Sequence, residues 1–303
     1  MVPERITVAV PFVSGIPYLE KALESVFAQS SPEWYLLLCD NCADPREREL
    51  ARALLEKYND PRASFQEGSR HLSMGANFNR CMDLAPTDLV TILHADDELL
   101  AGYVLHMLRA AQEYEAASMI FCPARIIGPL GQRVLSFVDV AKELFIPRSS
   151  GPVMLEGEKG LRALMAGNFI MAPTVCFRKS KLGGIRWSET LNMTLDLDLY
   201  SRTLLSAQTI VGIRGAALYA YRRHGSSATA RFNQNLYRFT EEAATYDIIA
   251  ERARSEGWHA AASVAKRKYT VRLHLLLLAV ADLANARFRA AESKLRLLFQ
   301  LNQ

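Results

Sequence analysis

Four short apolar runs alternate with amphipathic segments over the first hundred residues, and this alternation restricts the fold more than any other feature. The runs cover residues 6–10, 34–39, 63–66 and 89–93. Between the first two, apolar residues recur at helical spacing with one buried face, at Leu19, Ala22, Leu23, Val26 and Phe27. Strands and helices that alternate in this way build a parallel, doubly wound sheet. We therefore predict an α/β fold with a mostly parallel sheet flanked by helices.

The second half of the chain is less regular and ends in an all-helical extension. Residues 138–157 show little periodicity, which predicts a loop. The other predicted elements are a helix over 103–114, a strand over 119–122, a hairpin over 125–137, a helix over 158–166, a strand over 174–178, a helix over 195–207, strands over 209–213 and 216–222, and helices over 233–255, 258–284 and 288–301.

Composition excludes several classes of protein. The net charge of +4 over 303 residues is too small to indicate a nucleic-acid partner. The longest apolar run, residues 275–281, is far shorter than the ~20 residues that cross a bilayer. The chain opens directly into a strand without a signal peptide, and its five cysteines are odd in number and scattered. We expect reduced, mostly buried thiols and a cytoplasmic protein.

The stretch from Asp88 to Leu99 is the strongest candidate for a site. A buried apolar strand is followed at once by four ionisable residues, His94, Asp96, Asp97 and Glu98. Ligands bind at the carboxyl ends of strands in open parallel sheets. Two adjacent carboxylates repel each other unless a cation or several donors neutralise them, and a divalent ion with a phosphorylated substrate is the usual solution. The alternative is a solvated acidic turn that caps a helix beginning near Ala101.

Two common phosphate-binding motifs are missing. No glycine-rich fingerprint follows the first predicted strand, which argues against a dinucleotide-binding domain and against a P-loop.

Several separate motifs, in their order and spacing, resemble those of the inverting family 2 glycosyltransferases, which have the GT-A fold, a Rossmann-like fold of nucleotide-diphospho-sugar transferases. The resemblance covers about residues 5–228. The matching segments are Val8 to Phe12, Asp40, Asn79, His94 to Asp97, Leu195 to Arg202 and Tyr221 to His224. Two residues depart from the family pattern, because His94 replaces the first Asp of its Asp-x-Asp-Asp motif and Leu195 replaces a Glu.

The resemblance implies a role for each matching residue. It makes Asp196 the catalytic base and makes Asp96 and His224 ligands of Mn²⁺ or Mg²⁺, although His94 is also a competent metal ligand. The residues that it assigns to the nucleotide sugar are Pro11, Phe12, Val13, Asp40, Asn79, His94, Ala95 and Asp97. Asp40 would either recognise the nucleotide's base or only form an Asx turn. Asp97 would either bind a ribose hydroxyl or cap a helix. Asp198 is expected to pair with Arg202 at i+4.

The implied activity is transfer of a sugar from a nucleoside-diphosphate sugar, with a UDP-sugar favoured, to an acceptor hydroxyl with inversion. The predicted loop over 138–157 would close over the donor and exclude water. The acceptor would be a carbohydrate or lipid-linked sugar in cell-surface polysaccharide or glycolipid synthesis. The alternatives are a nucleotidyltransferase, whose glycine-rich opening loop is absent, and a non-catalytic module that binds sugar nucleotides.

The predicted domains follow the motifs. Residues 1–228 would form the catalytic domain, with a nucleotide-sugar half at 1–100 and an acceptor half at 101–228, and residues 229–303 a helical subdomain. From Glu251 onward the chain has ten Lys and Arg against four Asp and Glu. This basic face is either merely solvated or docks on anionic lipid at the inner face of the membrane.

Overall fold

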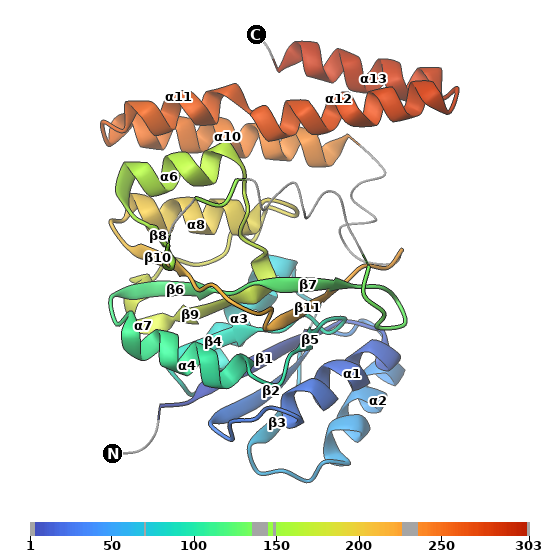
Figure 1. The fold of residues 1–303 in the computed structure, drawn as a ribbon. Coiled ribbons are helices and arrows are strands. Elements are labelled where there is room, and N and C mark those ends of the chain that lie inside the picture. The colour runs from blue at the N-terminus through green and yellow to red at the C-terminus, as the bar shows by residue number, and fades with distance from the viewer. Residues whose placement is uncertain (1–3, 70, 135–144, 148–149, 226–235, 302–303) are drawn as a thin grey trace.

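The computed structural model describes residues 4–69, 71–134, 145–147, 150–225 and 236–301. Its main sheet has eight strands in the order β3-β2-β1-β4-β9-β6-β10-β8 (Figure 1). The strands are β1 (Ile6–Phe12), β2 (Trp34–Asp40), β3 (Ala63–Gln66), β4 (Leu89–Ile92), β6 (Ala117–Phe121), β8 (Val153–Leu155), β9 (Val175–Arg178) and β10 (Thr209–Gly212).

The first four strands confirm the predicted parallel arrangement. β3, β2, β1 and β4 are parallel neighbours, and the helices between them begin and end close to the predicted positions. β9 runs antiparallel to both β4 and β6, so the sheet as a whole is mixed. The parallel half of the sheet therefore meets the rest of the sheet at the antiparallel strand β9.

A second, small sheet lies beside the end of β4. It contains β5 (Glu98–Leu99), β11 (Tyr219–Arg222) and β7 (Ala124–Ile127), with β11 in the middle. The predicted hairpin turn around Gly128 to Gly131 is present, because the Gly128 N–H donates to the Gln132 carbonyl and the Val134 N–H donates to the Ile126 carbonyl. β7 also pairs in parallel with β11, which was not predicted. A single bridge joins Ile127 to Arg133 across the turn, and residues 135–137 lie outside the described part of the chain.

Helices cover both faces of the main sheet because strand residues alternate between two apolar cores. Val8 and Val10 face the core shared with α1 (Ile16–Phe27), α2 (Pro45–Glu56) and α4 (Tyr103–Glu113). Ala9 faces the other core, which is shared with α3 (Met74–Leu84), α6 (Gly157–Ala166), α7 (Lys179–Leu182) and α8 (Leu195–Leu205). A short 3-10 helix, η1 (Ala172–Thr174), precedes β9.

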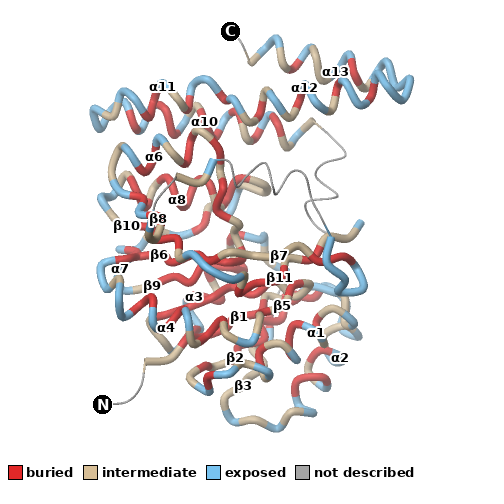
Figure 2. The backbone as a smooth tube through the Cα atoms, viewed as in Figure 1, coloured by how far each residue is buried: buried red, intermediate tan, exposed pale blue. Residues whose placement is uncertain are grey.

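The C-terminal helices form a further tier on α6 and α8 (Figures 1 and 2). They are α10 (Tyr237–Ser255), α11 (His259–Arg267), α12 (Tyr269–Ala284) and α13 (Phe288–Gln300). One apolar core extends from the sheet through α8 and α10 to Val271, Leu275 and Leu297. The predicted boundary between two domains near residue 228 remains a prediction, and the two parts share this core.

Two predicted segments are wrong. The single helix predicted over 258–284 is two helices, because Lys268 adopts a left-handed conformation with φ of 47° and separates α11 from α12. The loop predicted over 138–157 contains β8, which pairs with β10, and its last residue begins α6. Residues 138–144 and 148–149 lie outside the described chain.

None of the helices among the described residues is long and apolar enough to cross a membrane. All five cysteines are buried and free of disulfides, as expected.

Candidate active site

The candidate site lies at the carboxyl edge of the parallel strands. β1 and β2 end in register, with Phe12 opposite Asp40. The Leu93 N–H donates to the Ala9 carbonyl, so the chain leaves β4 alongside β1. Because parallel strands end at the same edge, the segments after Phe12, Asp40 and Leu93 lie together.

Asp96 and His224 meet at this edge. The His224 Nε2 atom lies 2.8 Å from Asp96 Oδ2, and the side chains of His224 and Asp96 are 9% and 32% exposed, respectively. His94, Asp96 and Asp97 each offer a ligand atom within 4.8 Å of the others. Carboxylate oxygen and imidazole nitrogen suit a divalent transition ion such as Mn²⁺. The predicted metal residues are therefore brought together from two distant parts of the chain.

Asp97 has a structural role in this arrangement. Its side chain is 1% exposed, and its two oxygens accept hydrogen bonds from the Arg222 N–H at 2.7 Å and the Tyr219 hydroxyl at 2.9 Å. Burial and the nearby charge of Asp96 raise the pKa of Asp97 well above its usual range. Asp97 thus ties the end of β4 to β11, and a ribose contact by this residue remains a prediction.

Arg222 holds the same junction from the other side. Its buried guanidinium donates to the Asp96 carbonyl at 2.7 Å and to the Gly128 carbonyl at 3.0 Å, and it forms an ion pair with Glu98. The predicted helix-capping alternative for the two aspartates is wrong, because α4 begins at Tyr103 and has no side-chain cap. The acidic turn is therefore held in place by β11, whose last residue, Arg222, lies two residues before His224.

His94, which replaces the family's first Asp, is suited to bind a metal. Its ring lies 5.9 Å from the Phe78 ring at an interplanar angle of 19°. Burial lowers the pKa of His94, against the opposing effect of Asp96. The imidazole is therefore neutral at physiological pH, which is the form that binds metal.

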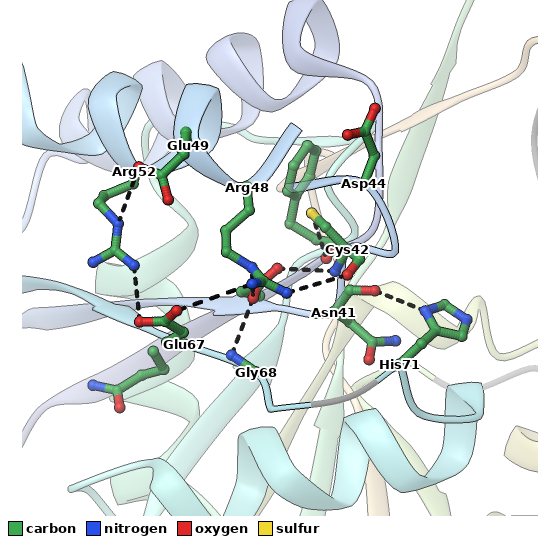
Figure 3. Close-up of polar contacts among 12 residues, drawn as sticks. Asn41, Cys42, Asp44, Arg48, Glu49, Arg52, Glu67, Gly68 and His71 are labelled. Carbon is green, nitrogen blue, oxygen red and sulfur yellow. Dashed lines mark hydrogen bonds and ion pairs between the residues drawn. The ribbon is translucent and has the colours of Figure 1, made fainter. Parts of the chain in front are cut away.

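Asp40 is surrounded by groups of the protein itself, and its partners Cys42, Arg48 and Gly68 are labelled in Figure 3. Its oxygens accept the N–H groups of Cys42 at 2.9 Å and Gly68 at 3.0 Å, and Arg48 Nε lies 2.6 Å away. Burial favours the neutral acid, but these hydrogen bonds and the Arg48 charge outweigh it and hold the pKa of Asp40 below its usual value. The bond to Cys42 is the expected Asx turn. Base recognition by Asp40 remains a prediction.

The neighbouring Asn41 was not predicted, although it organises the same edge. Its amide donates to the Leu72 carbonyl at 3.1 Å and accepts the Leu72 N–H at 2.8 Å. The Asn41 carbonyl lies 2.8 Å from His71 Nδ1 (Figure 3). Its position directly after Asp40 at the end of a strand was the available indication.

Asn79 makes a paired contact with the backbone of Trp187. Its amide donates to the Trp187 carbonyl at 3.0 Å and accepts the Trp187 N–H at 2.9 Å. The Trp187 ring packs edge-on against Phe78. Asn79 therefore positions the segment that leads into α8, and its predicted contact with the nucleotide sugar stays a prediction.

The predicted base, Asp196, lies in the first turn of α8 and is half-buried. Glu241 of α10 stabilises the entry to this helix, because its carboxylate accepts the N–H groups of Asn192 at 3.0 Å, Met193 at 2.6 Å and Thr194 at 3.0 Å. No sequence pattern pointed to Glu241, since it lies on a helix outside the predicted catalytic domain.

Two further polar side chains of α8, Asp198 and Tyr200, lie close to Asp196 in the sequence. Asp198 accepts two hydrogen bonds from Arg202, at 2.9 and 2.7 Å, which confirms the predicted i+4 pair. The Tyr200 hydroxyl is buried and has no hydrogen-bond partner among the described residues, and burial together with the charge of Asp196 raises its pKa well above the usual range. A structural role for Asp198 remains a prediction.

The other predicted donor residues border the same edge. Phe12 is buried, Pro11 and Ala95 are half-buried, and Val13 is 44% exposed. Their contact with a nucleotide sugar is a prediction.

Comparisons with known proteins identify a family and a curated protein whose sequences are similar to this chain. The sequence model described as Glycosyl transferase family 2 matches residues 7–160. Among curated proteins, the uncharacterized protein MT1568 of Mycobacterium tuberculosis is 25% identical over 209 residues, which are 66% of this chain and 62% of that protein. The chain thus spans less than two thirds of that relative.

Solved glycosyltransferase structures share the fold. TarS of S. aureus, residues 1–349 with UDP-GlcNAc, has a TM-score of 0.60 and 17% identity over 96% of this chain and 91% of that one. The mannosyltransferase PcManGT of Pyrobaculum calidifontis, with GDP-Man and Mn²⁺, has a TM-score of 0.59 and 14% identity over 98% and 83% of the two chains. A longer TarS chain matches at a TM-score of 0.57 and 15% identity, over 81% of this chain and 39% of that one.

Proposed function

Because the chain belongs to glycosyl transferase family 2, we propose that it transfers a sugar from a nucleoside-diphosphate sugar to an acceptor hydroxyl with inversion. The observation that carries the proposal is the pairing of Asp96 with His224 at the carboxyl edge of the sheet. The TarS and PcManGT complexes, which hold UDP-GlcNAc and GDP-Man, support a nucleotide-sugar donor. A UDP-sugar is the favoured donor.

The proposed metal ligands are Asp96 and His224, with His94 as a third. Their atoms fit a divalent cation, because Asp96 lies in one cluster with His94 and also contacts His224, while Asp97 accepts hydrogen bonds from β11. The Mn²⁺ in the PcManGT complex supports a divalent cation. When bound, such a cation stabilises as a Lewis acid the negative charge on the departing nucleoside diphosphate.

Asp196 is the proposed general base. Its carboxylate would take the proton from the acceptor hydroxyl as that oxygen attacks the anomeric carbon from the face opposite the leaving group. Glu241 fixes the backbone just before Asp196, and Asn79 fixes Trp187 upstream in the same segment. These contacts orient the base before substrate arrives, which lowers the cost of reaching the reactive geometry.

The proposed acceptor is a carbohydrate or a lipid-linked sugar, in the synthesis of a cell-surface polysaccharide or glycolipid. The proposal includes peripheral contact of the basic C-terminal helices with an anionic membrane. From α11 to α13 the sequence has eight Lys and Arg and only two Asp and Glu.

The test is release of nucleoside diphosphate from UDP-glucose, UDP-GlcNAc and GDP-mannose with Mn²⁺ or Mg²⁺. We expect release from at least one donor, loss of release with chelator and in Asp96→Asn, and normal release in the control Asp44→Asn, which keeps the exposed cap of α2. Nucleotide binding without release from any donor would favour a non-catalytic binding module. Formation of a sugar nucleotide from a nucleoside triphosphate and a sugar phosphate would favour a nucleotidyltransferase.

A further inference from the structure

The C-terminal helices line an open cationic cavity far from the candidate metal residues in the sequence. It has a volume of about 440 Å³ and lies among α10, α11, α12 and the end of α13. Four cationic side chains line it, and none of its described lining residues is acidic; the four are Arg254, Lys266, Arg267 and Arg272. The left-handed Lys268 produces the break between α11 and α12 around which these side chains gather.

Only part of this charge is neutralised within the protein. Lys266 forms an ion pair with Asp247 at 3.2 Å, and Asp247 is shared with Lys268 at 2.8 Å. Arg267 donates to the neutral Tyr269 hydroxyl at 2.9 Å. Across the described residues, Arg254 and Arg272 have no ion-pair partner. Cations gathered around one cavity repel each other unless an anion lies between them.

An apolar groove adjoins this cavity and shares Arg272 with it. The groove has a volume of about 340 Å³, and its other lining residues are Tyr269, Leu273, Leu276, Leu298 and Phe299. Leu273 is 53% exposed, Leu276 43% and Phe299 68%.

The apolar surface continues along α12. Leu277, Val280 and Leu283 are exposed, at the helical spacing that continues from Leu273. Figures 1 and 2 show α12 and α13 in the tier farthest from β1 and β2.

We propose that the cationic cavity and the apolar groove together bind one phosphate-headed lipid at an anionic membrane surface. The lipid phosphate lies among Arg254, Lys266 and Arg272, and its hydrocarbon chain lies along Leu273, Leu276 and Phe299. This inference rests on the membrane contact proposed above and is independent of sugar transfer.

Charge complementarity favours this occupant over a second copy of the chain. Paired α12 faces would cover the leucines but would leave both cationic cavities without counter-charge. An anionic lipid supplies the negative charge and the apolar surface in one molecule. A cationic and apolar surface of this kind is typical of helices that lie at the membrane interface.

The test is co-sedimentation of the full chain with vesicles of phosphatidylcholine alone, or of phosphatidylcholine and phosphatidylglycerol in equal parts. We expect binding to the anionic vesicles only, weakened by salt because the attraction is screened. Arg254→Gln with Arg272→Gln should lower the partition coefficient about 30-fold, the product of two lost cations near an anionic surface. Leu273→Gln with Leu276→Gln should lower it at least ~10-fold through lost apolar burial.

Matched controls separate the site from general effects. Arg46 is an exposed cation and Leu50 a 55% exposed leucine, both on α2, so Arg46→Gln and Leu50→Gln should leave binding unchanged. Melting temperature and UDP binding, measured on every variant, should match the wild type. A failure of UDP binding in the wild type would concern the transferase proposal alone.

Three results would overturn the lipid site. One is equal recovery in the supernatant with both vesicle types at low salt. Another is full competition by inorganic phosphate with no effect of the leucine variant, which would indicate a site for a free anion. The third is a wild-type dimer, seen by light scattering, that the leucine variant dissociates while vesicle binding is absent, which would indicate a second copy on this face.

Discussion

The carboxylate of Asp96 and the imidazole of His224 lie 2.8 Å apart, although 128 positions separate them in the chain. Asp96 follows β4 of the main sheet, whereas His224 follows β11 of the small sheet. The two sheets are joined at this point by the hydrogen bonds of Asp97 to Tyr219 and to the Arg222 N–H. The candidate metal site is therefore built on the junction between two sheets.

Asp97→Ala should destabilise the protein by about 2 kcal/mol, because the buried Arg222 N–H and Tyr219 hydroxyl then lose their hydrogen-bond partner. Urea denaturation measures this directly. Asp44→Asn should be near neutral, since Asn caps helices as well as Asp does. Normal stability combined with lost nucleotide binding would instead make Asp97 a direct ligand of the ribose.

Asp196→Asn and Asp198→Asn should have opposite phenotypes despite their proximity. Asp196→Asn should leave the fold and donor binding unchanged. The transfer rate should fall ~10²-fold or more, as expected for loss of a general base. Asp198→Asn should retain activity, and its free energy of unfolding should fall by ~1 kcal/mol because the ion pair with Arg202 is weakened. Steady-state kinetics and thermal unfolding of both variants check this. Swapped phenotypes would mean that Asp198 is the base.

Glu241→Gln should act on catalysis through the entry to α8. Gln can accept these backbone N–H groups only weakly and without charge, so we expect about 1.5 kcal/mol less stability. Because Asp196 loses its fixed orientation, kcat should fall while KM for the donor stays unchanged. The variant Glu242→Gln, on the same helix, is the control. An unchanged kcat would show that the α10 contact serves stability alone.

The stabilising effect of Glu241 should depend on pH. Burial raises the pKa of Glu241, but the hydrogen bonds from Met193, Asn192 and Thr194 prevail and place it below the ordinary value of 4.5. A carboxyl whose pKa is lower in the folded state stabilises the fold above its unfolded pKa, and this contribution is lost as pH falls through the folded pKa. The stability difference between wild type and Glu241→Gln should thus be constant above about pH 6 and shrink below 4.5. A difference that grows on acidification would contradict the assignment.

Local patterns predicted the parts of the structure that depend on near neighbours. The helix that ends at Phe27 was predicted from its apolar spacing, and the i+4 pair of Asp198 with Arg202 follows from helix geometry alone. The candidate metal residue Asp96 was predicted from the acidic turn that follows a buried strand. His224 was assigned through the resemblance to the family, since nothing near His224 in the sequence indicates its partner.

Long-range contacts could not be predicted in the same way. The acceptor role of Glu241 depends on α10 packing over α8, 47 positions away from Thr194. The Arg222 guanidinium reaches the Asp96 carbonyl only after β11 pairs with β5 and β7. Lys268 breaks the predicted long helix although no glycine or proline marks the position, because its buried side chain pairs with Asp247.

The most direct test of the account is the melting temperature with UDP, measured with Mn²⁺ and with chelator, for the wild type and Asp96→Asn. Ligand that binds only the folded protein raises stability, by about 2.7 kcal/mol at a hundredfold excess over Kd. We predict a larger UDP-induced increase with Mn²⁺ than with chelator in the wild type, no such difference in Asp96→Asn, and similar melting temperatures without ligand. A Mn²⁺-dependent increase of the same size in Asp96→Asn would contradict the placement of the metal at Asp96.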